Sequence, residues 1–71
     1  MFYIVLELQV NNGVPAAIVN VYPDEQKDQA YGKYFTILAA AAVSSCEVHG
    51  AYLTASTGGM LENYIFDRRE E

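Results

Sequence analysis

The chain has 71 residues, which allows one domain, spanning residues 1–71, and excludes a second. Hydrophobic residues make up 52% of it and charged residues 18%, a composition typical of a folded domain and not of a disordered one. Nine acidic residues against four basic ones give a net charge of −5, so we expect no nucleic-acid binding, because no basic surface is available for phosphates. One cysteine cannot form an internal disulfide and fits a reducing compartment.

The first residues are apolar but do not form a signal peptide, since no basic residue precedes them and Glu7 interrupts the run. The next longest apolar stretch, residues 37–43, is far short of the roughly 20 residues that span a bilayer. We therefore expect no membrane contact and a cytoplasmic location, or incorporation into a particle assembled there.

The N-terminal part predicts a β-hairpin. Apolar side chains at every second position predict a strand over about residues 2–10 and a returning strand over about residues 16–22. Asn12-Gly13 between them is typical of a tight hairpin turn, because both residues tolerate positive φ. Pro15 restricts the second strand to an edge of the sheet or places the proline in its first residues.

A long helix is predicted over about residues 26–45, with Asp24 as a plausible N-cap. The four alanines at positions 39–42 favour a helix and allow close approach of whatever packs on it. One face gathers residues at spacings of three and four, namely Ala30, Tyr34, Ile37, Leu38, Ala41, Ala42 and Ser45.

Strands over about residues 48–55 and 63–67 complete the pattern, with a turn at residues 56–59 and Gly50 marking a bulge or a tight contact. The fold class is α+β in the order ββαββ: two β-hairpins form one four-stranded sheet with one long helix packed on one face. The third strand lies beside the second in parallel or beside the first in antiparallel, and both orders stay open.

One helix covers only one face of such a sheet, so the other face needs a partner. We place Tyr3, Val5, Ile18 and Tyr22 on that other face, and Tyr31 on a possible tyrosine-rich binding surface. Their burial against a second copy predicts a homo-oligomer, with a two-fold dimer favoured, through the sheet face or the Ala-rich side of the helix. The alternative is that loops and the charged tail cover this face, or that the tyrosines serve cross-strand packing.

Cys46 and His49 have the spacing of metal ligands, yet a closed zinc site needs four such ligands and the chain has one cysteine and one histidine. We therefore predict no metal, no cofactor and no catalytic residue, and expect Cys46 to be a small buried residue and His49 a half-exposed strand residue.

Two other polar segments have simpler structural interpretations. Residues 54–59, rich in hydroxyls and glycine, lack the lysine and the following helix of a phosphate loop and predict a hairpin turn. Asp24, Glu25 and Asp28 lack the spacing of a calcium loop and are explained by helix capping.

The segment from Lys33 to Ser45, a Lys-Tyr-Phe-Thr-Ile-Leu helix running into four alanines, followed by Val48-His49, resembles small uncharacterised proteins encoded among phage and prophage structural genes. The resemblance covers about half of the chain. It implies a phage-borne accessory or structural protein and carries over no activity and no catalytic residue.

The sequence as a whole predicts a non-enzymatic structural or protein-interaction module that self-associates. The alternative is an acidic inhibitor or regulator that binds a basic site on a partner protein. A small oligomeric enzyme is a third interpretation, which requires Cys46, His49 and a carboxylate to converge in one pocket.

Overall fold

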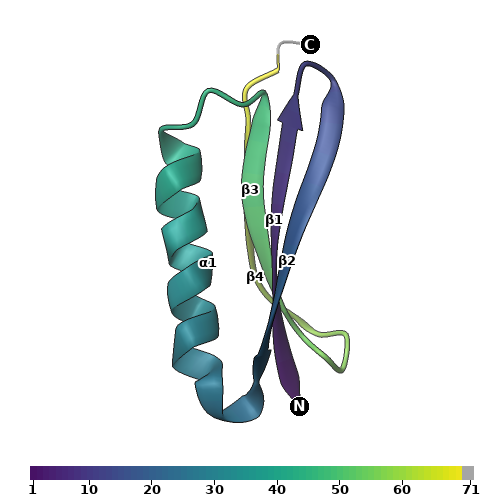
Figure 1. Cartoon of the computed structure of the whole chain (residues 1–71), viewed down its shortest axis with the longest axis vertical. Helices are drawn as coiled ribbons and strands as arrows, with labels where there is room; N and C mark the ends of the chain where they lie inside the picture. Colours follow the sequence, from purple (N-terminus) through teal and green to yellow (C-terminus); the bar gives the residue numbers. More distant parts are fainter. Residues whose placement is uncertain (70–71) are drawn as a thin grey trace.

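The computed structural model describes residues 1–69 and has the predicted α+β architecture in the order ββαββ. Two strands predicted over residues 16–22 and 63–67 begin earlier, at Val14 and Met60. In chain order the elements are β1 (Phe2–Asn11), β2 (Val14–Pro23), a short 3₁₀ turn η1 (Asp24–Gln26), α1 (Lys27–Ala42), β3 (Val48–Ala55) and β4 (Met60–Asp67) (Figure 1).

The four strands form one sheet in the order β2-β1-β3-β4, and every neighbouring pair is antiparallel. The helix therefore carries the chain from the edge strand β2 across to β3, which pairs with the far side of β1. This decides between the two strand orders left open by the sequence. Pro15 lies in an edge strand, where its missing N–H costs no ladder hydrogen bond.

Both hairpin turns form where the sequence predicts them. Asn12 and Gly13 have φ of 55° and 78°, the paired positive values of a type I′ turn. Gly58 takes φ of 97° in the second turn, which joins β3 to β4. The β3–β4 register shifts at Leu53 and Thr54, so the bulge lies a few residues beyond Gly50.

Gly50 is the tight contact. A Cβ on Gly50 would lie 2.7 Å from Cα of Ile65 and would also strike the Tyr64 carbonyl oxygen and the Ile65 side chain. Glycine is therefore required for β4 to approach β3 at this point, because any side chain would displace the strand.

The helix is shorter than predicted at its C-terminal end and begins differently. Asp24 lies within η1 and makes no side-chain cap, so the N-cap prediction is wrong. α1 ends at Ala42 and excludes Ser45. At this end the Arg68 guanidinium donates hydrogen bonds to the carbonyls of Ala41 (2.6 Å) and Ala42 (3.1 Å), and the Ser44 N–H also donates to Ala41. An arginine just after β4 thus adds a tertiary contact to the last turn of the helix.

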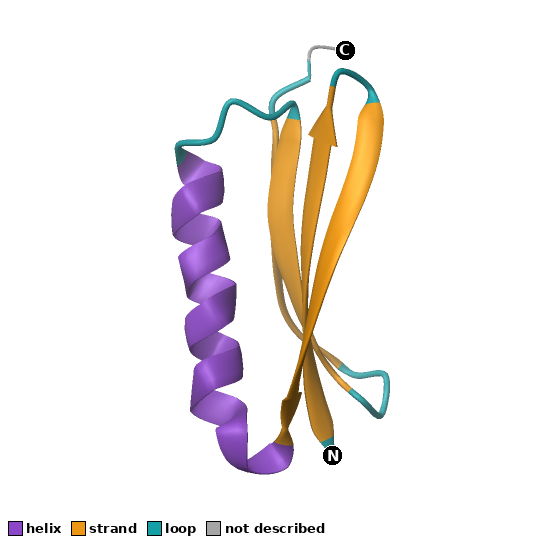
Figure 2. Ribbon diagram, in the orientation of Figure 1, coloured by secondary structure: helices purple, strands orange, loops and turns teal. Residues whose placement is uncertain are grey.

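The core is a single layer between α1 and one side of the sheet (Figure 2). From the predicted helix face, Ala30, Tyr34, Ile37 and Ala41 are buried, and Leu38 packs partly against them. From the sheet, the core contains Tyr3, Val5, Ala51 and Leu53. The helix lies on this side only, as Figure 1 shows.

Candidate functional site

The sheet side that carries the predicted contact residues is the side under the helix. Tyr3 and Val5, 5% and 0% exposed, belong to the buried core, so their prediction as a contact surface is wrong. They are buried because they pack in one cluster with Tyr34 and Ile37 of the helix and Leu53 of β3. Period-two alternation separates two sets of side chains but does not say which set the helix covers.

The other predicted contact residues also lie on or beside the helix. Ile18 and Tyr22 pair with Glu7 and Tyr3 and share their side of the sheet. Tyr22 and Tyr31 pack partly against the core, whereas Ile18 is 54% exposed at the edge of the sheet. The structure therefore does not bring these five predicted residues together into one exposed surface.

The opposite side of the sheet carries the alternate residues of the first hairpin, which the sequence interpretation left for the core when it placed Tyr3, Val5, Ile18 and Tyr22 outside. The strand registers put one cross-strand row of Val19, Leu6, Tyr52 and Asn63 at its centre. We call this side the open face, and its members are Phe2, Ile4, Leu6, Leu8 and Val10 of β1, Pro15, Ala17, Val19 and Val21 of β2, Val48, Gly50, Tyr52 and Thr54 of β3, and Met60, Asn63, Ile65 and Asp67 of β4.

The open face is apolar and nearly free of charge. Phe2, Val19, Val21 and Met60 remain between 52% and 61% exposed. Asp67, at one corner, is its only ionisable carboxylate, and Arg69 binds it at 2.7 Å. The side-chain and backbone hydrogen bonds from Arg69 lower the pKa of Asp67 to about 2.

Polar side chains gather on the side that the helix covers. By register Glu7, Gln9, Asn20 and Glu62 all lie on this side. In an ordinary half-covered sheet the polar side faces water and the apolar side faces the helix. In this sheet most charged side chains lie on the side that the helix covers. The alternation in the sequence separates the two sets of side chains, but it does not tell which set faces the helix.

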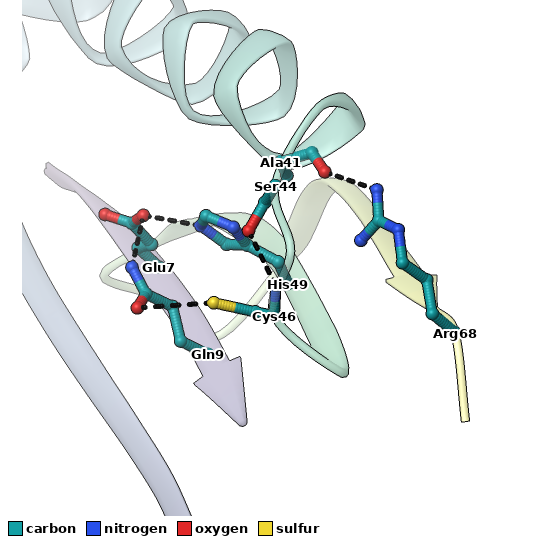
Figure 3. Close-up of polar contacts among 7 residues, drawn as sticks. All are labelled: Glu7, Gln9, Ala41, Ser44, Cys46, His49 and Arg68. Atoms are coloured by element: carbon teal, nitrogen blue, oxygen red, sulfur yellow. Dashed lines mark hydrogen bonds and ion pairs between the residues drawn. The ribbon is translucent and has the colours of Figure 1, made fainter. Parts of the chain in front are cut away.

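The polar residues form a chain of contacts between β1 and the start of β3 (Figure 3). Nε2 of His49 lies 2.7 Å from Oε2 of Glu7, and Gln9 donates to the same carboxylate oxygen at 2.9 Å. The Cys46 thiol lies 4.0 Å from Oε1 of Gln9. Burial alone would raise the pKa of Glu7, but the hydrogen bonds from His49 and Gln9, together with the charge of Lys33, lower it overall.

His49 is 5% exposed, so the expectation of a half-exposed residue is wrong: the diagonal contact with Glu7 and the packing of β3 bury it. A carboxylate can only accept, so Nε2 carries the proton, and Nδ1 is buried with no hydrogen-bond partner among residues 1–69. Cys46 is partly buried, and the two side chains are connected only through Gln9 and Glu7. A nucleophile and its base must be in direct hydrogen-bond contact, which this arrangement does not provide.

Neither a pocket nor a metal cluster is present in the described part of the chain. No cavity opens among residues 1–69, and no three of their His, Cys, Asp or Glu side chains are placed to hold a metal ion. Asp24 and Glu25 lie in η1, with Asp28 in the first turn of α1. Residues 54–59 form the end of β3 and a turn closed by a hydrogen bond from Gly58 N–H to the Ala55 carbonyl.

No helix within residues 1–69 combines the length and the hydropathy that a membrane crossing requires. Comparison of the chain with protein-family models, with curated proteins and with solved structures found no significant match.

Proposed function

We propose that the chain is a small non-enzymatic structural or protein-interaction module that self-associates through its open face. The observation that supports this is the exposed apolar side of the sheet: most side chains of the open face are apolar and Asp67 is its one charged member, whereas Glu7, His49 and Glu62 lie on the side with the helix. In a permanent monomer the apolar side chains of the open face would stay in contact with water, which is unfavourable.

The free energy at stake is substantial for a chain of this size. Complete burial of a large apolar side chain contributes about 1.5–3 kcal/mol, so the half-exposed Val19 and Val21 alone would contribute about 2 kcal/mol on contact. A domain of about 70 residues has few kcal/mol of stability of its own. Association would therefore supply a large fraction of the stability of the folded state.

A structural role also agrees with the resemblance of residues 33–45 to small phage proteins, whose members would be parts of an assembled particle. The acidic alternative uses another surface: Asp24, Glu25 and Asp28 lie around the start of the helix. That surface would bind a basic partner through charge, and added salt would weaken it.

Sedimentation velocity from low micromolar to millimolar concentration tests the proposal, at low and at high salt. We expect a mass above that of the monomer, with a dissociation constant that high salt leaves unchanged or lowers, because apolar contacts are not screened. A monomer at every concentration would overturn the proposal. Capture of a basic protein that salt releases, with no self-association, would favour the acidic regulator instead.

A further inference from the structure

The open face has almost no charged groups, and this limits the kind of partner that it can bind. A partner with charged groups would leave them unpaired and dehydrated against the side chains of Leu6, Val19 and Tyr52. A chain with net charge −5 repels its own copies unless the contact surface excludes the acids, and here the one carboxylate of the open face lies at a corner in an ion pair. A second copy of this chain presents such an uncharged apolar surface.

The size of the open face matches the requirement of a stable dimer. Strands of eight to ten residues, at about 3.3 Å per residue, and four strands about 4.8 Å apart give roughly 500–600 Å² in projection. Side-chain relief makes the accessible area larger than the projection. A standard interface buries about 800 Å² on each partner, so the whole face, and not one edge of it, would be used.

Resting on the self-association proposed above, we propose that two copies pack open face to open face about a two-fold axis. The product is a sandwich of two four-stranded sheets with the helices on the outside, the aligned packing that twisted sheets adopt about 10 Å apart. The axis runs between the two central strands near Leu6 and Tyr52, so Leu6 of one copy meets Tyr52 of the other. Val19 and Val21 on β2 extend the contact toward the edge.

Two adjacent residues of β2 provide a matched test. Val19 and Ile18 are 56% and 54% exposed, lie in the same edge strand and point to opposite sides of the sheet. Val19→Glu puts two carboxylates into each dimer interface, and we expect the dimer to weaken about 100-fold or more. Ile18→Glu adds the same charge outside the interface, and we expect a change of less than about threefold.

Both sites are exposed, so the monomer accommodates either substitution, and far-ultraviolet circular dichroism checks that each variant is folded. Equal weakening by the two variants would mean that net charge, and not the open face, controls association, and would overturn the face-to-face arrangement. Retention of the wild-type dissociation constant in Val19→Glu would overturn it as well.

Nuclear magnetic resonance on a mixture of isotope-labelled and unlabelled chains gives the second readout. We expect intermolecular nuclear Overhauser effects between the methyl groups of Leu6 and Val19 in one copy and the Tyr52 ring in the other. A dimer whose intermolecular effects come from Ala39, Ala40 and Val43 would be helix-mediated; it would overturn this arrangement and leave self-association standing. A wild-type chain that sediments as a monomer would remove both.

Discussion

Glu7 and His49 are diagonal neighbours on adjacent antiparallel strands, and Nε2 of the imidazole lies 2.7 Å from Oε2 of the carboxylate. Both side chains lie on the side of the sheet that faces the helix, with 16% and 7% of their surface exposed. Each therefore satisfies part of the hydrogen-bonding need of the other in a place where water reaches neither well, while Nδ1 of His49 has no partner among residues 1–69. The pair is a structural contact: removal of one partner destabilises the fold, whereas replacement of both partners by apolar residues has little effect on stability.

Replacement of one partner alone is expected to destabilise the fold. Glu7→Met leaves the His49 N–H without an acceptor, and His49→Leu leaves the carboxylate with Gln9 as its remaining hydrogen-bond donor. We expect each to lower the free energy of unfolding by about 2 kcal/mol. The double variant removes both polar groups and is expected to lie within about 1 kcal/mol of the wild type. Urea denaturation of the four proteins measures the coupling, and additive single effects would contradict the pairing.

Acid is expected to weaken the fold through Glu7. Its pKa is lower in the folded chain than in the unfolded one, so its contribution to stability is complete above the unfolded pKa and is lost as the pH falls through the folded pKa. Denaturation between about pH 5 and pH 3 should show this loss, and Glu7→Gln should flatten it. Asp67→Asn is the control: the pKa of Asp67 falls from an ordinary 3.8 to about 2, so its loss occurs between about pH 4 and pH 2, and this variant should leave the slope between pH 5 and pH 4 unchanged. An unchanged slope in Glu7→Gln would contradict the prediction.

Gly50→Ala is expected to separate β4 from β3. The added methyl group would lie 2.7 Å from Cα of Ile65, a backbone atom that cannot rotate away, so we expect a loss of about 3 kcal/mol or more. Gly32→Ala is the matched control: its Cβ meets nothing within 4 Å and it lies inside α1, so a gain of about 0.5–1 kcal/mol follows from helix propensity alone. Thermal denaturation at one fixed protein concentration compares them.

Arg68→Gln is expected to loosen the end of the helix. The guanidinium bonds two carbonyls of the last turn and lies 5.4 Å from the Phe66 ring, and its loss should lower the free energy of unfolding by about 1 kcal/mol. Amide hydrogen exchange at positions 40–43 should rise first. Arg69→Gln, which removes an exposed contact to Asp67, is expected to leave exchange at these positions unchanged.

Local patterns in the sequence were sufficient for the elements and for both hairpin turns. Asn12-Gly13 predicts the first hairpin because its backbone demand is local, and the recurrence of Ala30, Tyr34 and Ile37 predicts the buried helix face for the same reason. The ends of the helix were less predictable. Arg68, distant in sequence, donates hydrogen bonds to the carbonyls of the helix's last turn.

The choice of face was not available from the alternation of β1. Tyr3 and Val5 form one set with Glu7, and Ile4 and Leu6 form the other, so the more apolar set is the natural candidate for the core. The structure buries the less apolar set, and there Glu7 is accommodated by its contact with His49 on the neighbouring strand. This contact joins side chains 42 residues apart in the sequence, so it cannot be predicted from the alternation within one strand.

β1 occupies the middle of the sheet although it precedes the other strands in the chain. Its partner β2 follows a two-residue turn and joins it within microseconds, whereas β3 leaves the ribosome only after the whole helix has been made. During that interval the new hairpin exposes the unpaired backbone edge of β1. It also exposes the apolar side chains on both of its sides to other chains, including identical ones on the same messenger RNA. The edge of β1 that pairs with β3 therefore stays unpaired until residues 48–55 have been made.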